Sequence, residues 1–372
     1  MNQVLLDLEP QRPETTAPAQ AAAGAASCAR TDEQVGFQIG WDHARHGLVP
    51  PPEWLEGTPL GQGWRAGKAV QGGRTMPAPW VTRQWLALRA QAWREGAAFD
   101  TEHLTAVRLA RLHGARCPIT RAALGGARGT PDAPVVERLD PARGYALDNV
   151  AVISLAASRA RAGLSTLDAL RRAHRLQAGE PADGGLDAAA WTRLAALRAF
   201  ATPLPFHEAA RLPLTVLPPP GVVLVNPVQR LQVLLTLQFG KPGWSNRTRE
   251  IAQALPAHTA RQDYHLFIGA LAPRVVEAGS TPGAAGHQAA LEDAWLHERV
   301  LRRWQHFVLS LGEAGVQALI EHIGSMGTRT VLRITGTAAV APRTPRGDSR
   351  VLNGPGRAPA CRSAAPRPVA CP

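Results

Sequence analysis

The sequence predicts an α+β protein that is mainly α-helical, with one small ββα unit placed among the helices. Three observations predict this fold class. Apolar residues recur at helical three-to-four spacing over much of the chain, most clearly in residues 289–323. Residues 135–161 read instead as two strands, a turn and a helix. Both ends are rich in Ala, Pro, Gly or Thr and lack an apolar pattern, so we expect disordered termini.

Composition divides the chain into six segments. We expect a disordered leader at 1–35, a Trp-rich loop and helix segment at 36–100 that packs on the next domain, a domain with the ββα unit and flanking helices at 101–178, a linker at 179–187, a helical domain at 188–323 and a flexible tail at 324–372. Six of the ten tryptophans lie in the second segment. Tryptophans at this density form a compact core in most proteins, and base-stacking platforms are the alternative.

The predicted helices follow from apolar periodicity and capping residues. In the first half they are Val81–Arg94, Thr101–His113, a helix that starts near the N-cap Ser154 and runs past Arg161, and Thr166–Gln177. In the second half they are Leu186–Phe200, Pro227–Phe239, Trp244–Leu271 and Ala289–Ile323. The last segment carries an apolar seam at Leu301, Trp304, Val308 and Leu311. Such a seam packs against neighbouring helices or, as the alternative, forms a homodimer interface.

Charge favours a polyanionic partner. The formal net charge is +12, but arginine outnumbers lysine 39 to 2, which also suggests a GC-rich coding bias. Distribution is more informative than the total, since residues 103–175 hold 12 arginines and 5 acidic residues. A basic patch there would attract a phosphate backbone without regard to base sequence.

The cysteines and the apolar runs exclude other classes. None of the four cysteines forms a Cys-x-x-Cys pair, so we expect no zinc site, and Cys117 reads as a reduced, buried thiol. No apolar run approaches 18 residues, so we expect no membrane span and a cytoplasmic protein. The chain also lacks a phosphate-binding glycine loop and a Gly-x-Ser-x-Gly elbow.

One stretch carries a motif. It runs Glu137-Arg138-Leu139-Asp140-Pro141, then a turn at Gly144-Tyr145, then Asn149-Val150, and Ser158 follows nine residues after the asparagine. This spacing resembles the ββα finger of HNH (His-Me finger) endonucleases, over residues 117–161. The resemblance implies a strand that ends in the catalytic segment, a loop asparagine that braces the strands, and a helix that supplies a metal ligand.

The residues at the matching positions predict binding rather than cleavage. The resemblance assigns catalytic positions to Glu137, Arg138, Asn149 and Ser158. Arg138 stands where the family has its histidine base, and a guanidinium has no acceptor for a proton. Ser158 is a poor ligand for a hard cation, which leaves Glu137 and Asp140 as candidate ligands for Mg²⁺ or Mn²⁺. We expect DNA binding with little or no catalysis.

The basic residues near the motif are the expected DNA contacts. They are Arg138, Arg143, Arg159, Arg161, Arg171, Arg172 and Arg175. Arg138 should share one surface with the arginines at 159, 161, 171, 172 and 175.

Three alternatives remain open from the sequence. In the first, the motif is an unrelated hairpin, since Asp-Pro-x-x-Gly-Tyr is also an ordinary turn. In the second, the chain is an active metal-dependent endonuclease in which Glu137, Asp140 or His113 replaces the base. In the third, it is a helical structural or partner-binding protein.

Two weaker motifs deserve mention. Residues 246–255 followed by 259–271 resemble a helix-turn-helix, although Pro256 interrupts the turn. His43 and His46 are one helical turn apart with Asp42 beside them, which suits a metal site or an ordinary helix end.

Overall fold

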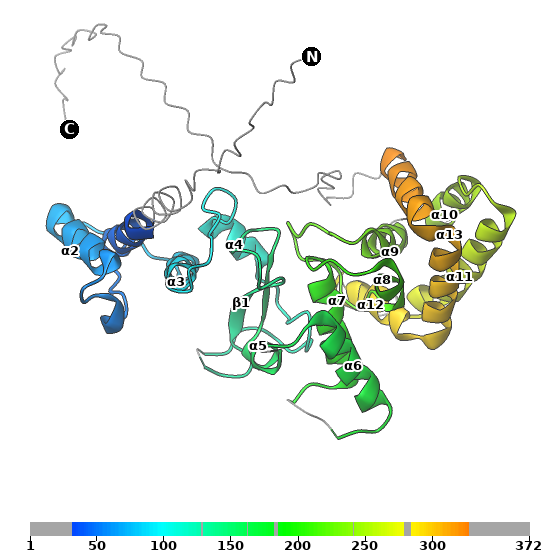
Figure 1. Cartoon of the computed structure of the whole chain (residues 1–372), viewed down its shortest axis with the longest axis horizontal. Coiled ribbons are helices and arrows are strands. Elements are labelled where there is room, and N and C mark those ends of the chain that lie inside the picture. Colours follow the sequence, from blue (N-terminus) through cyan, green and yellow to red (C-terminus); the bar gives the residue numbers. More distant parts are fainter. Residues whose placement is uncertain are drawn as a thin grey trace, which may run out of the picture. The chain divides into compact units, whose positions relative to one another are not determined.

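The computed structural model describes residues 32–326 except for 128, 162, 182–184, 241 and 279–283. These described residues are mainly helical, with 60% helix, 5% strand and one two-stranded antiparallel sheet (Figure 1). The mainly helical α+β class is therefore confirmed. Nearly all of the expected leader and tail, residues 1–31 and 327–372, lies outside the described residues.

The Trp-rich segment is more helical than its Gly and Pro content predicts. It contains a helix over residues 32–45, η1 (Pro52–Trp54), α2 (Pro59–Gln71) and α3 (Trp80–Arg94). Glycines let the first helix and α2 approach closely. A Cβ atom on Gly40 would lie 1.9 Å from the carbonyl oxygen of Leu60, and one on Gly63 equally close to that of Phe37. Gly40 and Gly63 thus serve helix packing rather than a loop.

The two helices nearest to the sheet in sequence are α3 and α4 (Ala106–Leu112). α3 matches the predicted helix at 81–94, whereas α4 is shorter than predicted. α4 begins late because Thr105 caps it, accepting a hydrogen bond from the backbone N–H of Arg108. Val107 of α4 is 65% exposed.

The sheet joins β1 (Pro134–Arg138) to β2 (Val150–Ser154), with Pro134 opposite Ser154 and Arg138 opposite Val150. β2 is buried on both faces. Val150 and Val152 belong to a cluster with residues of α3 and α4, while Ala151 and Ile153 belong to the core of the following helices.

The helix after the sheet starts where the sequence predicts. α5 (Leu155–Ala160) follows β2 directly, and the hydroxyl of Ser154 caps it by accepting the N–H of Ala157. It ends at Ala160 with Arg161 as C-cap, so it does not run past Arg161 as predicted.

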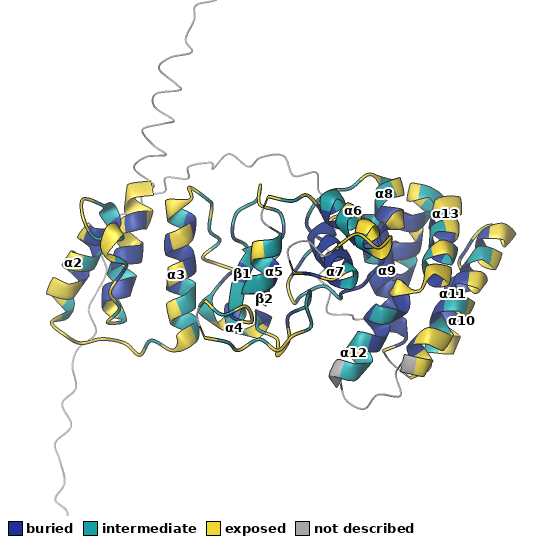
Figure 2. Cartoon of the chain, turned by 90° about the horizontal axis from the view of Figure 1, so that it is seen from below, coloured by how far each residue is buried: buried dark blue, intermediate teal, exposed yellow. Residues whose placement is uncertain are grey.

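The segment 179–187 does not divide the hydrophobic core. α6 (Thr166–Gln177) packs against α7 (Ala188–Ala199) across it. One buried cluster contains Cys117 and Ile153 from the sheet region together with Trp191 from α7. Figure 2 shows α7 dark blue along its length. Because α7 is buried on nearly every side, the sheet region and the helices after it fold around a shared core.

The remaining helices complete that core. They are α8 (Phe206–Arg211), α9 (Pro227–Gln238), α10 (Trp244–Gln253), α11 (His258–Ala278), α12 (Ala284–Asp293), η2 (Ala294–Leu296) and α13 (Glu298–Ser325). α13 breaks at Gly312, whose φ is 70°. In the seam predicted for this region, Trp304 and Val308 are fully buried within the chain. Since α13 packs on α8, α9 and α11, the seam is core, and its role as a dimer interface has no support.

The helix-turn-helix pattern corresponds to α10 and α11. Tyr264, Phe267 and Leu271 of α11 are fully buried, so this side of the second helix serves the core. In the described part of the chain, no helix is both long and apolar enough to cross a membrane.

Candidate nucleic-acid interface

The centre of the candidate site is a carboxylate held between two donors. Glu137, near the end of β1, accepts hydrogen bonds from the Ser158 hydroxyl of α5 through Oε1 and from Arg161 Nη2 through Oε2. Arg161 Nη1 also donates to the Arg138 carbonyl oxygen, at 3.2 Å. The Glu137 and Arg161 side chains are only 20% and 17% exposed. The structure therefore joins two of the four motif positions, Glu137 and Ser158, through a direct hydrogen bond.

The asparagine of the motif braces the loop between the strands. Asn149 is completely buried. Its Nδ2 donates to the carbonyl oxygens of Asp140, at 3.0 Å, and Gly144, at 2.9 Å, and its Oδ1 accepts the Asp140 N–H at 2.9 Å. One buried amide thus satisfies three backbone groups in a loop that has no other regular structure.

Arg138 has a different position from the one expected. Its guanidinium donates to the carbonyl oxygens of Pro141 and Arg143, at 3.0 and 3.2 Å, and to the Glu95 carboxylate at 3.3 Å. It also lies 4.8 Å from the ring centroid of Tyr145. Adjacent residues of a strand point to opposite faces, so Arg138 and Glu137 diverge. Arg138 closes the loop and does not share one surface with the arginines of α5 and α6.

Tyr145 contacts the same carboxylate, Glu95, that Arg138 contacts. Its hydroxyl donates to Glu95 at 3.2 Å. Burial, followed by the negative charge of Glu95, raises the pKa of Tyr145 to about 12.

A pocket of about 640 Å³ opens beside Glu137. It is lined by Glu137, Pro141, Ser158, Arg159, Arg161, Gly163, Leu164, Ser165 and Arg198. Three arginines here face one carboxylate. Arg198 comes from the C-terminal end of α7. It was not among the expected contacts, because no motif spacing links it to residues 137–161.

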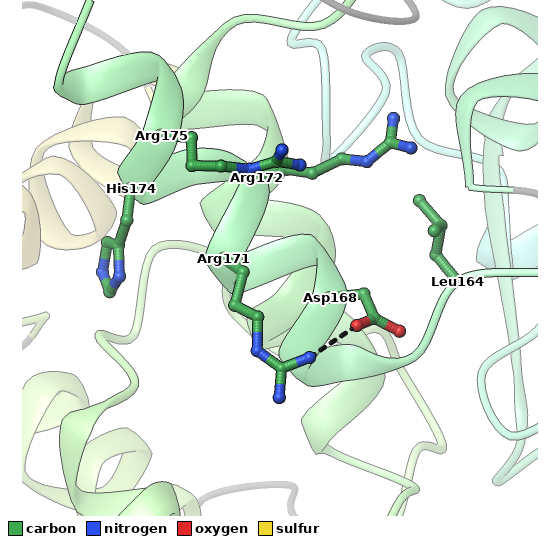
Figure 3. A pocket seen from close by; sticks show the side chains of 6 residues that line it. All are labelled: Leu164, Asp168, Arg171, Arg172, His174 and Arg175. Carbon is green, nitrogen blue, oxygen red and sulfur yellow. Dashed lines mark hydrogen bonds and ion pairs between the residues drawn. The ribbon is translucent and has the colours of Figure 1, made fainter. Parts of the chain in front are cut away.

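A second pocket of about 530 Å³ adjoins the first, because Leu164 lines both. Its other lining residues all belong to α6: Asp168, Arg171, Arg172, His174 and Arg175. Figure 3 shows the ion pair between Arg171 and Asp168, whose closest atoms are 2.8 Å apart. The guanidinium of Arg172 lies 5.2 Å from the ring centroid of Trp191 on α7. Together the two pockets hold six arginines and two carboxylates.

Two other predicted residues lie elsewhere. Arg143 pairs with Asp148 at 2.6 Å and lines neither pocket. His113, the candidate replacement base, makes an edge-on contact with Trp80, with ring centroids 4.6 Å apart. Burial lowers the pKa of His113.

The residues present do not suit a divalent ion. Both carboxylate oxygens of Glu137 are engaged by Ser158 and Arg161, and Asp140 Oδ1 accepts the N–H of Ala142 at 3.0 Å. Within the described ranges, no three His, Cys, Asp or Glu side chains come together as metal ligands. A guanidinium next to the carboxylate would repel an incoming cation.

His43 in the first helix and His46 just after it each lie against a backbone carbonyl oxygen. His43 is buried with Nδ1 2.8 Å from the carbonyl oxygen of Ile39, and desolvation lowers its pKa. His46 Nδ1 lies 3.1 Å from the carbonyl oxygen of Pro77.

The thiol of Cys117 is free and buried. Burial raises its pKa, but hydrogen bonds from Ser154 and Thr120 outweigh that effect and leave the pKa lowered. The N–H groups of Ser154 and Thr120 lie 3.3 and 3.5 Å from the sulfur. The sulfur thus ties the turn at 117–120 to the start of α5.

Comparison with protein-family models, with curated proteins and with solved structures finds no match for this chain.

Proposed function

We propose that this chain is a nucleic-acid-associated protein whose ββα unit is a degenerate HNH-like finger that binds a phosphate backbone without cleaving it. Two features support the finger. The order is strand, asparagine-braced loop, strand and helix, and the helix begins directly at the end of β2. Asn149 binds the loop at the position that the motif gives to the family's asparagine.

The observation that carries the proposal is the pairing of Glu137 with Arg161 at the edge of an arginine-lined pocket. The carboxylate that would hold a metal ion holds a guanidinium instead. Hydrolysis of a phosphodiester needs a base and charge stabilisation at the leaving oxygen, and an arginine can supply only the second. The same guanidinium can hold a phosphate by parallel hydrogen bonds.

The two adjoining pockets give the binding surface. Arginines from α5, α6 and α7 surround them, and the acidic residues there are Glu137 and Asp168. Contacts of this kind recognise phosphates rather than base edges, so they predict affinity with little sequence preference. The active-endonuclease alternative has less support, because both carboxylate oxygens of Glu137 are engaged by Ser158 and Arg161, and Oδ1 of Asp140 accepts the N–H of Ala142.

A salt series tests this proposal. The affinity of the full chain for labelled duplex and single-stranded DNA would be measured by fluorescence anisotropy between low and physiological salt. We expect log Kd to change linearly with log salt, with a slope that reports the number of phosphates neutralised. The double reversal Arg171→Glu with Arg175→Glu should weaken binding about tenfold or more and flatten the slope.

The control is matched in charge and setting. Arg274 and Arg302 lie on α11 and α13, and each pairs with a glutamate of its own helix, as Arg171 pairs with Asp168. Reversal of both should leave the affinity within about twofold of wild type. Equal losses in the two double variants would assign binding to net charge alone. Absence of salt-dependent binding in wild type would favour the structural-protein alternative.

A further inference from the structure

Arg198 is a buried cation with few partners. The residue is 7% exposed. Its Nη1 donates to the carbonyl oxygen of Leu164, and its Nε is buried without a hydrogen-bond partner among the described residues. No carboxylate of the described chain forms an ion pair with it. An arginine has five N–H donors, so most of this guanidinium's hydrogen-bonding capacity is unused.

Burial of the Arg198 charge is unfavourable when no ligand is bound. Desolvation lowers the pKa of Arg198 and the positive charge of Arg161 lowers it further, while the more distant carboxylates of Asp140, Asp168 and Glu137 oppose this without outweighing it. A buried charge without a counter-ion is unfavourable, and protein interiors rarely keep one without a use. No carboxylate of the described residues pairs directly with Arg198, so an ion pair within the chain does not account for an arginine at this position.

The position of Arg198 in the pocket suggests that it binds an anionic ligand. It lines the 640 Å³ pocket together with Arg159 and Arg161, and the hydroxyl-bearing Ser158 and Ser165 line the same wall. Arg161 is fixed in place by Glu137, so its charge is held at the pocket before any ligand arrives. An anion with several oxygens would accept hydrogen bonds from the unused N–H groups of Arg198. It would also neutralise the excess positive charge of the arginines that line the pocket.

We propose that this pocket is a single-phosphate site in which Arg198 is the innermost ligand, with Arg159 and Arg161 closing over the phosphate oxygens. The proposal rests on the proposed function for the source of the phosphate, and the site itself follows from the pocket. A phosphate group fits because its oxygens accept several hydrogen bonds from guanidinium groups at once. The group could come from the end of a nucleic-acid strand or from an internal phosphodiester.

Thermal unfolding of the full chain with inorganic phosphate tests the site directly. A ligand that binds only the native state raises Tm according to its concentration relative to Kd. At a tenfold excess over Kd we expect a rise of about 2–3 °C, against sodium chloride of equal ionic strength. Arg198→Met should abolish the rise, and in phosphate-free buffer it should leave Tm unchanged or higher, because it removes a desolvated charge.

Arg230→Met is the matched control. Arg230 on α9 is also partly buried, with a pKa lowered by desolvation and an Nε without a partner in the described structure, but it lines neither arginine pocket. It should keep the full phosphate response. A phosphate response in Arg198→Met equal to that of wild type would overturn the proposal, as would a wild type that responds to phosphate no more than to chloride.

Two further arms separate the sources and the two proposals. Displacement of phosphate by 5′-phosphorylated but not 5′-hydroxyl oligonucleotides would assign the site to a strand end, and equal displacement would assign it to the internal backbone. A phosphate response dependent on Arg198 without any DNA binding would support the site and reject the nucleic-acid function. DNA binding that is unchanged in Arg198→Met, without a phosphate response in wild type, would support the nucleic-acid function and reject the phosphate site.

Discussion

Arg161 at the end of α5 donates to the carboxylate of Glu137 near the end of β1, across 24 residues of sequence. This ion pair occupies the point where strand and helix meet, and both side chains are largely shielded from water. It engages the Glu137 carboxylate, which also accepts from Ser158, and places a guanidinium beside the pocket.

The first prediction concerns the strength of this pair. Glu137→Gln and Arg161→Gln should each destabilise the chain, because each leaves a mostly buried charge without its partner. We expect losses of about 1–3 kcal/mol in the free energy of unfolding for each single variant. The double variant should lose less than the sum, and urea unfolding of all four proteins would measure the coupling. Strict additivity would show that the pair does not interact in solution.

The second prediction concerns Asn149. Asn149→Ala removes three buried hydrogen bonds and should cost about 1–3 kcal/mol in the free energy of unfolding. Asn149→Asp should be at least as destabilising, because a carboxylate would face the carbonyl oxygens of Asp140 and Gly144. The control is Asn246→Ala on α10, where the side chain is exposed. Similar urea midpoints for the Asn149 and Asn246 variants would contradict a bracing role.

The third prediction concerns Tyr145. Because its pKa is raised to about 12, it should ionise well above the usual pH 10 in the native chain. Tyr264, the second of the two tyrosines, is fully buried and its pKa is also raised. Absorbance at 295 nm should therefore show no ionisation near pH 10 before unfolding. Glu95→Gln should lower the Tyr145 midpoint, since it removes a negative neighbour.

The sign of the linked stability follows from that shift. The unfolded chain loses the tyrosine proton near pH 10 and the native chain near pH 12, so the neutral phenol stabilises the fold below pH 10. This contribution is lost as the pH rises from 10 to 12. A Tyr145→Phe variant should show a smaller fall in stability over this window, and an equal fall would place the cause elsewhere.

The fourth prediction concerns the link between the sheet region and the later helices. Arg121 donates to Asp293 at 2.6 Å and to the buried Glu292 at 3.1 Å, and burial opposes but does not outweigh the resulting rise in its pKa. Arg121→Ala should destabilise the chain, because it leaves the buried Glu292 carboxylate without its partner. We expect a loss of about 1–3 kcal/mol, less than for a fully buried pair, because the Arg121 side chain is partly exposed. Adding Glu292→Gln should recover part of this loss in urea unfolding. A double variant as unstable as the sum would reject the pairing.

Periodicity and capping were enough to locate most helices. α6 was predicted to the residue, and Ser154 was identified as the cap of α5. The buried run at 150–153 became β2, which is covered on both faces. These features depend on local contacts, which is why local sequence is enough to predict them.

Features that depend on distant contacts were missed. The segment at 179–187 has the composition of a linker. However, α7 is apolar on nearly every side, so it packs against both α6 and the sheet region. Arg138 was aligned by its position in the motif, and its actual partner Glu95 lies 43 residues earlier. Arg198 reaches the pocket only because α7 ends beside Leu164. Spacing within a motif cannot predict such contacts.

The measurement that tests the central claim most directly is nicking of supercoiled plasmid by the purified full chain with Mg²⁺ or Mn²⁺. It would be run at a protein concentration at which anisotropy shows the DNA to be bound, with wild type and Glu137→Ala side by side. We predict bound but intact plasmid in both cases, because Arg161 occupies the carboxylate that would hold the metal ion. Metal-dependent nicking by wild type that Glu137→Ala abolishes would contradict the account and identify an active nuclease.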